Sequence, residues 1–207
     1  MVRLSMPRIE EIQQYFTGSW RMMMGKPDGL RLLDISADGF WNSFFAIAVA
    51  LPALVAGWVT IANTLASGSV SFGDRLSIML RLATVDLGTW IVPIAAFAVA
   101  AGPARLSDRF AHYVISSNWG SALIIWLMLP PTLLRMFVPS ADNFSSIVSV
   151  VLFAISLALT WRLTNVALGK GAAIATALFA AMFLLSFMVL YGLQFIVGLP
   201  GVDQALG

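Results

Sequence analysis

The chain has 207 residues, of which 59% are apolar and 11% charged, and its mean hydropathy is +0.89. These values exclude a water-soluble globular domain and indicate an integral membrane protein. The chain has no cysteine and one histidine, and its twelve basic residues form no run of the kind that binds nucleic acid. The composition therefore predicts no disulfide, no metal site or other cofactor, and no nucleic-acid partner.

The N-terminal segment predicts a surface helix, and its start lacks the apolar core of a cleaved signal peptide. Met6-Pro7 is a good helix opening, and the stretch 8–24 carries apolar side chains at three- and four-residue spacings. The predicted apolar face consists of Ile9, Ile12, Phe16, Trp20 and Met23. Such an amphipathic helix suits the headgroup plane of a bilayer, the inner mouth of a helix bundle, or a partner protein. We assign residues 1–39 to a cytoplasmic amphipathic segment.

Five apolar runs follow, and each can cross a bilayer as one helix. We expect spans at about 40–61, 82–102, 113–134, 145–163 and 172–197, with the fourth ending at Trp161 or Leu163. The stretch 62–81 is expected to be a loop with an interfacial turn. The predicted fold is all-α: a polytopic membrane protein with a five-helix transmembrane domain over 40–197 and a short outer tail over 198–207.

Local signals refine these spans. Pro130-Pro131 removes two backbone donors and predicts a kink or an end in the third span. Asp142 or Asn143 is the expected N-cap of the fourth, and Gly169-Lys170-Gly171 the expected loop before the fifth. Small side chains recur along two spans and predict faces for close helix packing. They are Ala46, Ala50, Ala53 and Gly57 in the first span and Ala173, Ala177 and Ala181 in the fifth.

The lysines and arginines predict the orientation of the chain. With five spans, nine of the twelve fall on the side of the N-terminus, and Arg75, Arg81 and Arg135 fall on the other. The positive-inside rule then puts the N-terminus in the cytoplasm and the C-terminus outside. We expect the location to be a bacterial-type inner membrane.

Asp86 is the sharpest candidate for a functional group, because an ionisable side chain at membrane depth needs protein around it. Residues that share its helical face are Thr89, Trp90, Pro93 and Phe97. Residues expected at its depth in other spans are Arg135, Tyr191 and Gln194. Three interpretations stay open: a proton or cation relay or substrate contact, a structural hydrogen bond to a neighbouring helix, and a span that starts later and leaves Asp86 in the interface.

A second polar group is expected near the cytoplasmic face: Asn42, His112, Ser116, Ser117, Asn118 and Ser121. It can line a vestibule, or its amides and hydroxyls can bridge helices; Asn118 is the candidate site residue among them. Four tryptophans fall near predicted inner ends of spans, where an interfacial belt is expected rather than a ligand cage. They are Trp20, Trp41, Trp119 and Trp161.

Three stretches resemble the Yip1-type membrane domain, including its bacterial branch. They are Lys-Pro-Asp-Gly-Leu-Arg-Leu-Leu at 26–33, Leu-Met-Leu-Pro-Pro-Thr-Leu-Leu at 127–134 and Gly-Lys-Gly-Ala-Ala at 169–173. The resemblance covers about residues 25–197 and implies five spans, a cytoplasmic head and a short outer tail. The eukaryotic branch carries an Asp-Leu-Tyr-Gly-Pro motif and binds small prenylated GTPases. This chain lacks the motif, so the resemblance implies neither a GTPase partner nor a functional residue.

The sequence contains no carboxylate pair, nucleophile elbow or metalloprotease motif, so we expect no enzymatic activity. Two functions stay open. The first is a scaffold or assembly protein that engages lipid, other membrane proteins or a second copy through the amphipathic head and the small-residue faces. The second is a small permease or transporter subunit with an intramembrane coupling or substrate-binding carboxyl. The candidate residues for this second function are Asp86, Pro93, Asn118, Arg135 and Gln194.

Overall fold

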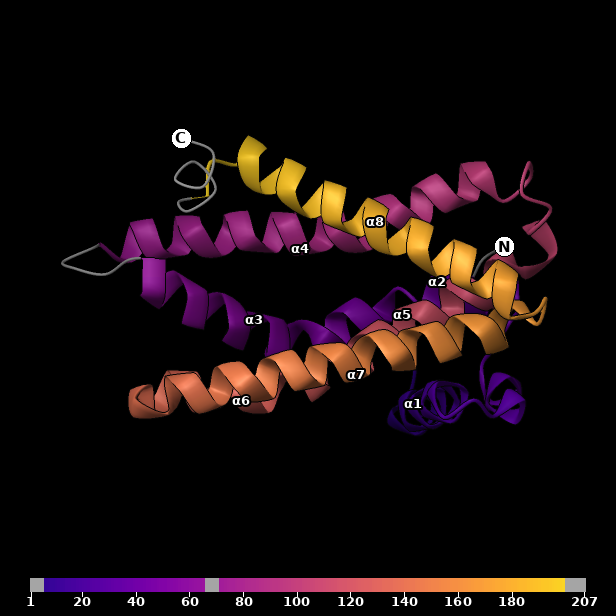
Figure 1. Ribbon diagram of the computed structural model, residues 1–207, viewed down its shortest axis with the longest axis horizontal. Helices are drawn as coiled ribbons and strands as arrows, with labels where there is room; N and C mark the ends of the chain where they lie inside the picture. Colours follow the sequence, from indigo (N-terminus) through magenta and orange to yellow (C-terminus); the bar gives the residue numbers. More distant parts are fainter. Residues whose placement is uncertain (1–5, 66–70, 200–207) are drawn as a thin grey trace.

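The computed structural model describes residues 6–65 and 71–199, and these stretches form helices with no β-strand (Figure 1). The bounds of the helices are α1 Ile9–Met23, η1 Pro27–Leu32, α2 Ala37–Asn42, α3 Phe45–Leu65, α4 Phe72–Ala100, η2 Ser107–Arg109, α5 Phe110–Leu127, α6 Leu129–Phe137, η3 Pro139–Ala141, α7 Asp142–Leu168 and α8 Ala172–Ile196.

Five helical units are long and apolar enough to cross a membrane, which confirms the predicted all-α architecture with five spans. They are Ala37–Leu65, Phe72–Ala100, Ser107–Phe137, Asp142–Leu168 and Ala172–Ile196. In Figure 1 these units run along the long axis of the molecule, and α1 and the end of α8 lie at opposite ends of it. An odd number of spans requires this separation.

The second span begins ten residues earlier than the sequence analysis predicts, at Phe72 instead of 82. The cause is a capping box that the apolar pattern does not reveal. The Ser71 hydroxyl accepts a hydrogen bond from the backbone N–H of Asp74 at 3.2 Å, and the Asp74 carboxylate in turn accepts from the backbone N–H of Ser71. As a consequence Asp86 is the middle residue of α4, at its greatest distance from both ends of the helix.

The five membrane-length units form a closed ring. Helix α3 packs against α4 and α5, α5 packs against α7, α7 against α8, and α8 against α4. The α4–α8 contact is close at Gly88, where an added Cβ would overlap the Leu193 side chain. Because every member of the ring touches two others, side chains on the inner faces of all five units can meet at one place.

The small-residue faces have different outcomes on the two spans. On α3, Ala46, Ala50 and Ala53 are buried, and the first two pack in one cluster with Ala122 of α5, as predicted. Gly57, the fourth member of this face, has no close neighbour, since an added Cβ would meet nothing within 4 Å. On α8 all three alanines of the face, Ala173, Ala177 and Ala181, are exposed, so this face lies outside the bundle and close packing there stays a prediction. The inward face of α8 carries Ala175 and Leu178 instead. A helix that is apolar all round gives no sequence signal for its inner side.

The third and fourth spans differ in how well their turns are predicted. The third breaks at Met128, between α5 and α6, with Pro130-Pro131 in the first turn of α6, so the predicted kink is confirmed. The N-cap prediction for the fourth span is wrong. Its cap is Ala141, because η3 leads into α7 so that Asp142 already has helical backbone angles. Gly169 ends α7 in the left-handed conformation, with φ of 59°, as the predicted loop requires.

Helix α1 lies across the end of the bundle rather than along it, and Figure 1 shows it nearly end-on. It packs against α5 and α7. Met22 and Met23 are 0% and 1% exposed, whereas Ile9 and Trp20 are 72% and 48% exposed. The side of α1 that meets the bundle is therefore rotated away from Ile9 and Trp20, two members of the predicted apolar face.

Helix α1 and η1 form a tight hairpin on this end of the bundle. The guanidinium of Arg21 pairs with the Asp28 carboxylate, and this hydrogen-bonded pair holds the pKa of Asp28 below its usual value. The side chain of Gln14 donates to the carbonyl of Leu32 at 3.0 Å. Gly18 and Gly29 let the two backbones touch, since a Cβ on Gly18 would stand 2.8 Å from the Gly29 carbonyl oxygen.

Candidate ligand pocket inside the helix ring

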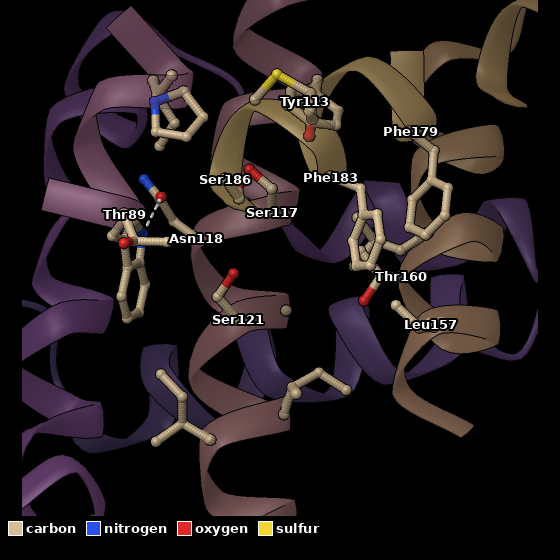
Figure 2. A pocket seen from close by; sticks show the side chains of 18 of the residues that line it. Thr89, Tyr113, Ser117, Asn118, Ser121, Leu157, Thr160, Phe179, Phe183 and Ser186 are labelled. Atoms are coloured by element: carbon tan, nitrogen blue, oxygen red, sulfur yellow. Dashed lines mark hydrogen bonds between the residues drawn. The ribbon is translucent and has the colours of Figure 1, made fainter. Parts of the chain in front are cut away.

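A pocket of about 400 Å³ lies inside the ring and is lined by residues from α1, α3, α4, α5, α7 and α8. Most of the lining is apolar, and hydroxyl groups are spread through it. Figure 2 shows Thr89 and Asn118 on one side of the pocket and Phe179 and Phe183 of α8 on the other. The hydroxyl-bearing residues other than Tyr113 are Thr89, Ser117, Ser121, Thr160 and Ser186.

Asp86 lines this pocket from the middle of α4. One carboxylate oxygen, Oδ2, accepts a hydrogen bond from the indole Nε1 of Trp58 on α3 at 2.6 Å. Trp58 is 7% exposed, so it fixes the carboxylate from inside the protein. Among the described residues, Asp86 has no cationic partner within ion-pairing distance and no second hydrogen-bond donor. Arg81 instead donates to the carbonyl of Gly198 at 2.9 Å.

Asn118 of α5 lines the pocket and bridges α4 and the turn before α3. Its Oδ1 accepts from the indole Nε1 of Trp90 on α4 at 2.9 Å, and its Nδ2 donates to the hydroxyl of Ser43, before α3, at 2.9 Å. The Ser43 hydroxyl donates onward to the carbonyl of Phe40 at 2.7 Å. Asn118 is 0% exposed, so this network replaces water for an amide that would otherwise be unpaired. This geometry suits the helix-bridging interpretation of Asn118.

The face predicted around Asp86 is largely a face of the pocket. Thr89, Trp90 and Pro93 line it, whereas Phe97 belongs to a separate core cluster. Pro93 has no N–H to donate to the carbonyl of Thr89, and the Thr89 hydroxyl has no hydrogen-bond partner among the described residues. One turn of α4 therefore carries the Asp86 carboxylate and a buried hydroxyl that has no partner among the described residues.

The other candidate residues are divided between the pocket and its surroundings. Ser117 and Ser121 line the pocket with Asn118, so two groups that are separate in the sequence analysis meet in one place. Ser116 lies outside it, with its hydroxyl 3.6 Å from the sulfur of Met22. Asn42 and His112 are also absent from the lining.

Arg135 and Gln194 do not take part in the pocket. Arg135 lies on α6, where its guanidinium donates to the hydroxyl of Ser146 at 3.0 Å and stands 3.6 Å from the carboxylate of Asp142. Gln194 lies near the end of α8, and its side chain makes no hydrogen bond with any described residue. The structure thus gives neither residue a contact with Asp86.

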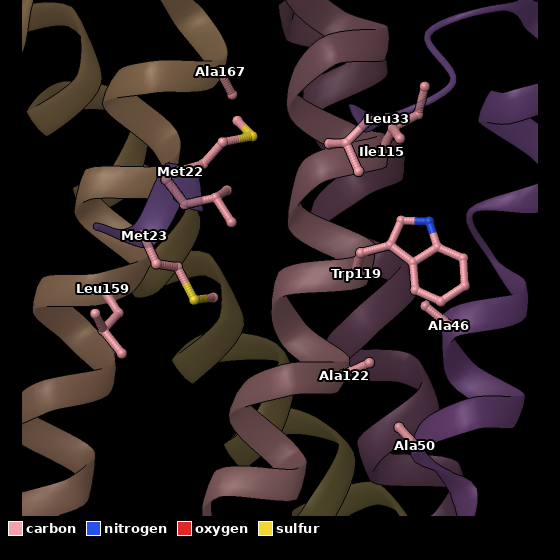
Figure 3. Packing of buried hydrophobic residues seen from close by; sticks show 11 residues of the cluster. Met22, Met23, Leu33, Ala46, Ala50, Ile115, Trp119, Ala122, Leu159 and Ala167 are labelled. Carbon is pink, nitrogen blue, oxygen red and sulfur yellow. The ribbon is translucent and has the colours of Figure 1, made fainter. Parts of the chain in front are cut away.

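The belt interpretation fails for Trp119. This side chain is 1% exposed and packs under α1, with its ring centroid 5.0 Å from that of Tyr15 and 5.8 Å from that of Phe16. Figure 3 shows it in the cluster that receives Met22 and Met23 between α5 and α7. Met23 continues from this cluster to the pocket and lines it. The N-terminal helix therefore contributes to the pocket wall.

Sequence reasoning missed several pocket residues and one partner of a pocket residue, Trp58, which lies outside the lining. Trp58 lies 28 positions before Asp86, and no periodicity links residues on different helices. Thr160, Ser186 and the phenylalanines of α8 were also missed. A signal was present for some of them: Trp58 lies well inside an apolar span, away from the ends where belt tryptophans occur, and Ser186 is a polar residue in the middle of the most apolar span.

Replacing Asn118 with alanine is expected to lower the free energy of unfolding by about 1–2 kcal/mol, since the Trp90 indole loses its acceptor and Ser43 its donor. Thermal unfolding of the detergent-solubilised chain, followed by size exclusion, measures the change. Asn42→Ala is the matched control, because Asn42 is half-buried and outside this network, and its effect should stay within about 0.5 kcal/mol. Equal effects of the two substitutions would contradict the bridging role.

Fold and pocket together define the class: a helical chain whose five membrane-length helices, compatible with an integral membrane protein, surround a mostly apolar pocket with hydroxyl groups and one carboxylate. A scan against protein-family models finds no match, and searches of curated proteins and of solved structures also find none.

Proposed function

We propose that this chain is a small membrane permease, or the ligand-binding subunit of one, and that the pocket inside the ring is its solute site. The observation that supports this function is the place of Asp86, which lies mid-helix in α4 and lines a pocket to which all five membrane-length units contribute. Intramembrane carboxylates are costly and mark substrate or ion pathways in many membrane proteins. A volume of about 400 Å³ lies within the range of small-molecule sites.

The proposal includes an orientation. The excess of basic residues at the end that carries α1, η2 and the Gly169 turn supports a cytoplasmic location for that end, in a bacterial-type inner membrane. In this orientation α1 lies in the plane of the inner headgroups. The exposed side chains of Ile9 and Trp20 suit such an interfacial helix, whose opposite side packs on the bundle.

A second candidate is the scaffold or assembly function. The observation in its favour is the exposed small-residue face of α8, formed by Ala173, Ala177 and Ala181, which allows close approach of another membrane helix. A Yip1-type relationship would agree with this function, although the chain lacks the GTPase-binding motif of the eukaryotic branch. A scaffold needs no water-connected pocket, and this requirement separates the two candidates.

Cysteine accessibility tests the proposed function, and the absence of native cysteines makes the background clean. The variants Ser121→Cys and Ser186→Cys place a thiol on the pocket wall from α5 and α8. A permease pocket contains water, which a thiol needs to ionise and react with a charged methanethiosulfonate reagent. We expect both thiols in native membranes to react at least about tenfold faster than a lipid-facing thiol.

The matched control is Met188→Cys, two residues from Ser186 on the same helix but 72% exposed on the outside of the ring. Asn143→Cys, exposed at the start of α7, sets the rate for a thiol in water. If the thiols at 121 and 186 react as slowly as the one at 188, the pocket has no connection to water. That result would refute the permease proposal and favour the scaffold.

A further inference from the structure

The pocket has one sign of charge. Asp86 is the only charged side chain among the described residues that line it, and no lysine, arginine or histidine belongs to the lining. A carboxylate at this depth is stabilised by a partner of opposite charge, which the described part of the protein does not supply. A negatively charged ligand would add a second negative charge to the same apolar space. The charge of the pocket therefore favours a cation.

The polar groups near Asp86 are poor in donors and rich in acceptors. Trp58 supplies one N–H to Oδ2 of Asp86, and Oδ1 has no donor among the described residues. One turn along α4, the hydroxyl of Thr89 is buried without a hydrogen-bond partner among the described residues. Pro93, four residues after Thr89, has no backbone N–H to donate to the carbonyl of Thr89. An ammonium group has several N–H donors and no acceptor, so it matches this arrangement.

The opposite wall of the pocket distinguishes an organic cation from a metal ion. Phe179 and Phe183 are stacked on α8 with ring centroids 6.0 Å apart, and Figure 2 shows them across the pocket from Thr89 and Asn118. Aromatic rings attract organic cations and bury apolar groups. A hard metal cation would need six or more oxygen ligands, and no described group of acidic or histidine side chains is arranged to hold a metal.

We infer that the solute is an organic monocation, an ammonium group joined to an apolar or aromatic body. The ammonium group binds Asp86 and the hydroxyl of Thr89, and the apolar body lies toward Phe179 and Phe183. This inference rests on the proposed function, since it names the class of solute for the same pocket.

Calorimetric titration of the full chain in phosphatidylcholine nanodiscs tests the inference, with empty nanodiscs subtracted. The probes share one phenylethyl body and differ in the polar end: 2-phenylethylammonium, neutral 2-phenylethanol and anionic 3-phenylpropanoate. We expect the ammonium to bind at least about tenfold more tightly than the alcohol, and the carboxylate to bind more weakly than either, because a charged hydrogen-bonded pair contributes more than a neutral one. This comparison uses only the natural chain.

The substitution Asp86→Asn keeps the size of the side chain and an acceptor for Trp58 but removes the charge. It should weaken ammonium binding at least about tenfold and leave the affinity for the alcohol unchanged. Asp142→Asn is the matched control: it makes the same chemical change on an exposed carboxylate at the start of α7, so all three affinities should stay as they are.

The outcomes separate this inference from the proposed function. If the natural chain binds the alcohol as tightly as the ammonium, the solute class is wrong and a permease for neutral solutes remains. If no probe binds while the thiols at 121 and 186 react quickly, the inference again falls alone. If no probe binds and those thiols are unreactive, both proposals fall.

Discussion

Replacing Trp119 with alanine is expected to lower the free energy of unfolding by about 3 kcal/mol and to release α1 from the bundle. Trp119 is 1% exposed, and its ring is in contact with Tyr15 and Phe16 of α1. Truncation leaves a cavity under α1, and the side chains around that cavity lose dispersion contacts that nothing replaces. Because Met22 and Met23 belong to the same cluster, their burial should be lost as well.

Two measurements check this expectation. Thermal unfolding in detergent gives the loss of stability, and limited trypsin digestion reports release of α1 through cleavage after Arg21 or Arg31. Trp20→Ala is the matched control, since Trp20 lies on α1 itself but is 48% exposed. This substitution should change the free energy of unfolding by no more than about 0.5 kcal/mol. Similar results for the two tryptophans would mean that Trp119 is not part of the core.

Replacing Gly29 with alanine should separate η1 from α1. An added Cβ would overlap the carbonyl oxygen of Gly18 and stand 2.9 Å from side-chain carbons of Arg21 and Met22. The obstacle at Gly18 is backbone, which cannot rotate away as a side chain can, so the hairpin must open. We expect a loss of about 1–3 kcal/mol, the usual range for overpacking.

Trypsin cleavage after Arg21 on α1 and Arg31 on η1 should become faster in Gly29→Ala, while the five spans keep their helical circular dichroism. Gly57→Ala on α3 is the control for a glycine-to-alanine substitution without a steric obstacle, because a Cβ at Gly57 would meet nothing within 4 Å. In the interior of a helix that substitution should raise stability by about 0.5–1 kcal/mol. Unchanged proteolysis of Gly29→Ala would contradict the close approach of Gly18 and Gly29.

The spans themselves are predictable because their signal is length and apolar content, which a bilayer imposes on any crossing helix. The break at Pro130-Pro131 is predictable for a local reason as well, the missing backbone donors. Helix boundaries are harder to predict than the spans. The start of α4 depends on Ser71 and Asp74, two polar residues that hydropathy counts against a helix although they stabilise its first turn.

The candidate pocket is half predictable. Helical periodicity places Asp86, Thr89, Trp90 and Pro93 on one face, and that face does line the pocket. The helix that lies opposite this face is determined by the order of the helices around the ring. The periodicity within one helix carries no information about that order. The partners Trp58 for Asp86 and Trp90 for Asn118 therefore came only from the structure. The inner side of α8 stayed hidden for a related reason, since nearly all of its faces are apolar.

The place of α1 constrains the order in which the molecule can be assembled. Helix α1 is synthesised well before α7, yet Met22 and Met23 share a cluster with Leu163 and Ala167 of α7. Until α7 is made, the site of these two side chains lacks one wall. Helix α1 can thus dock completely only after α7 is made, and a chain truncated before Leu163 should carry an unsettled α1.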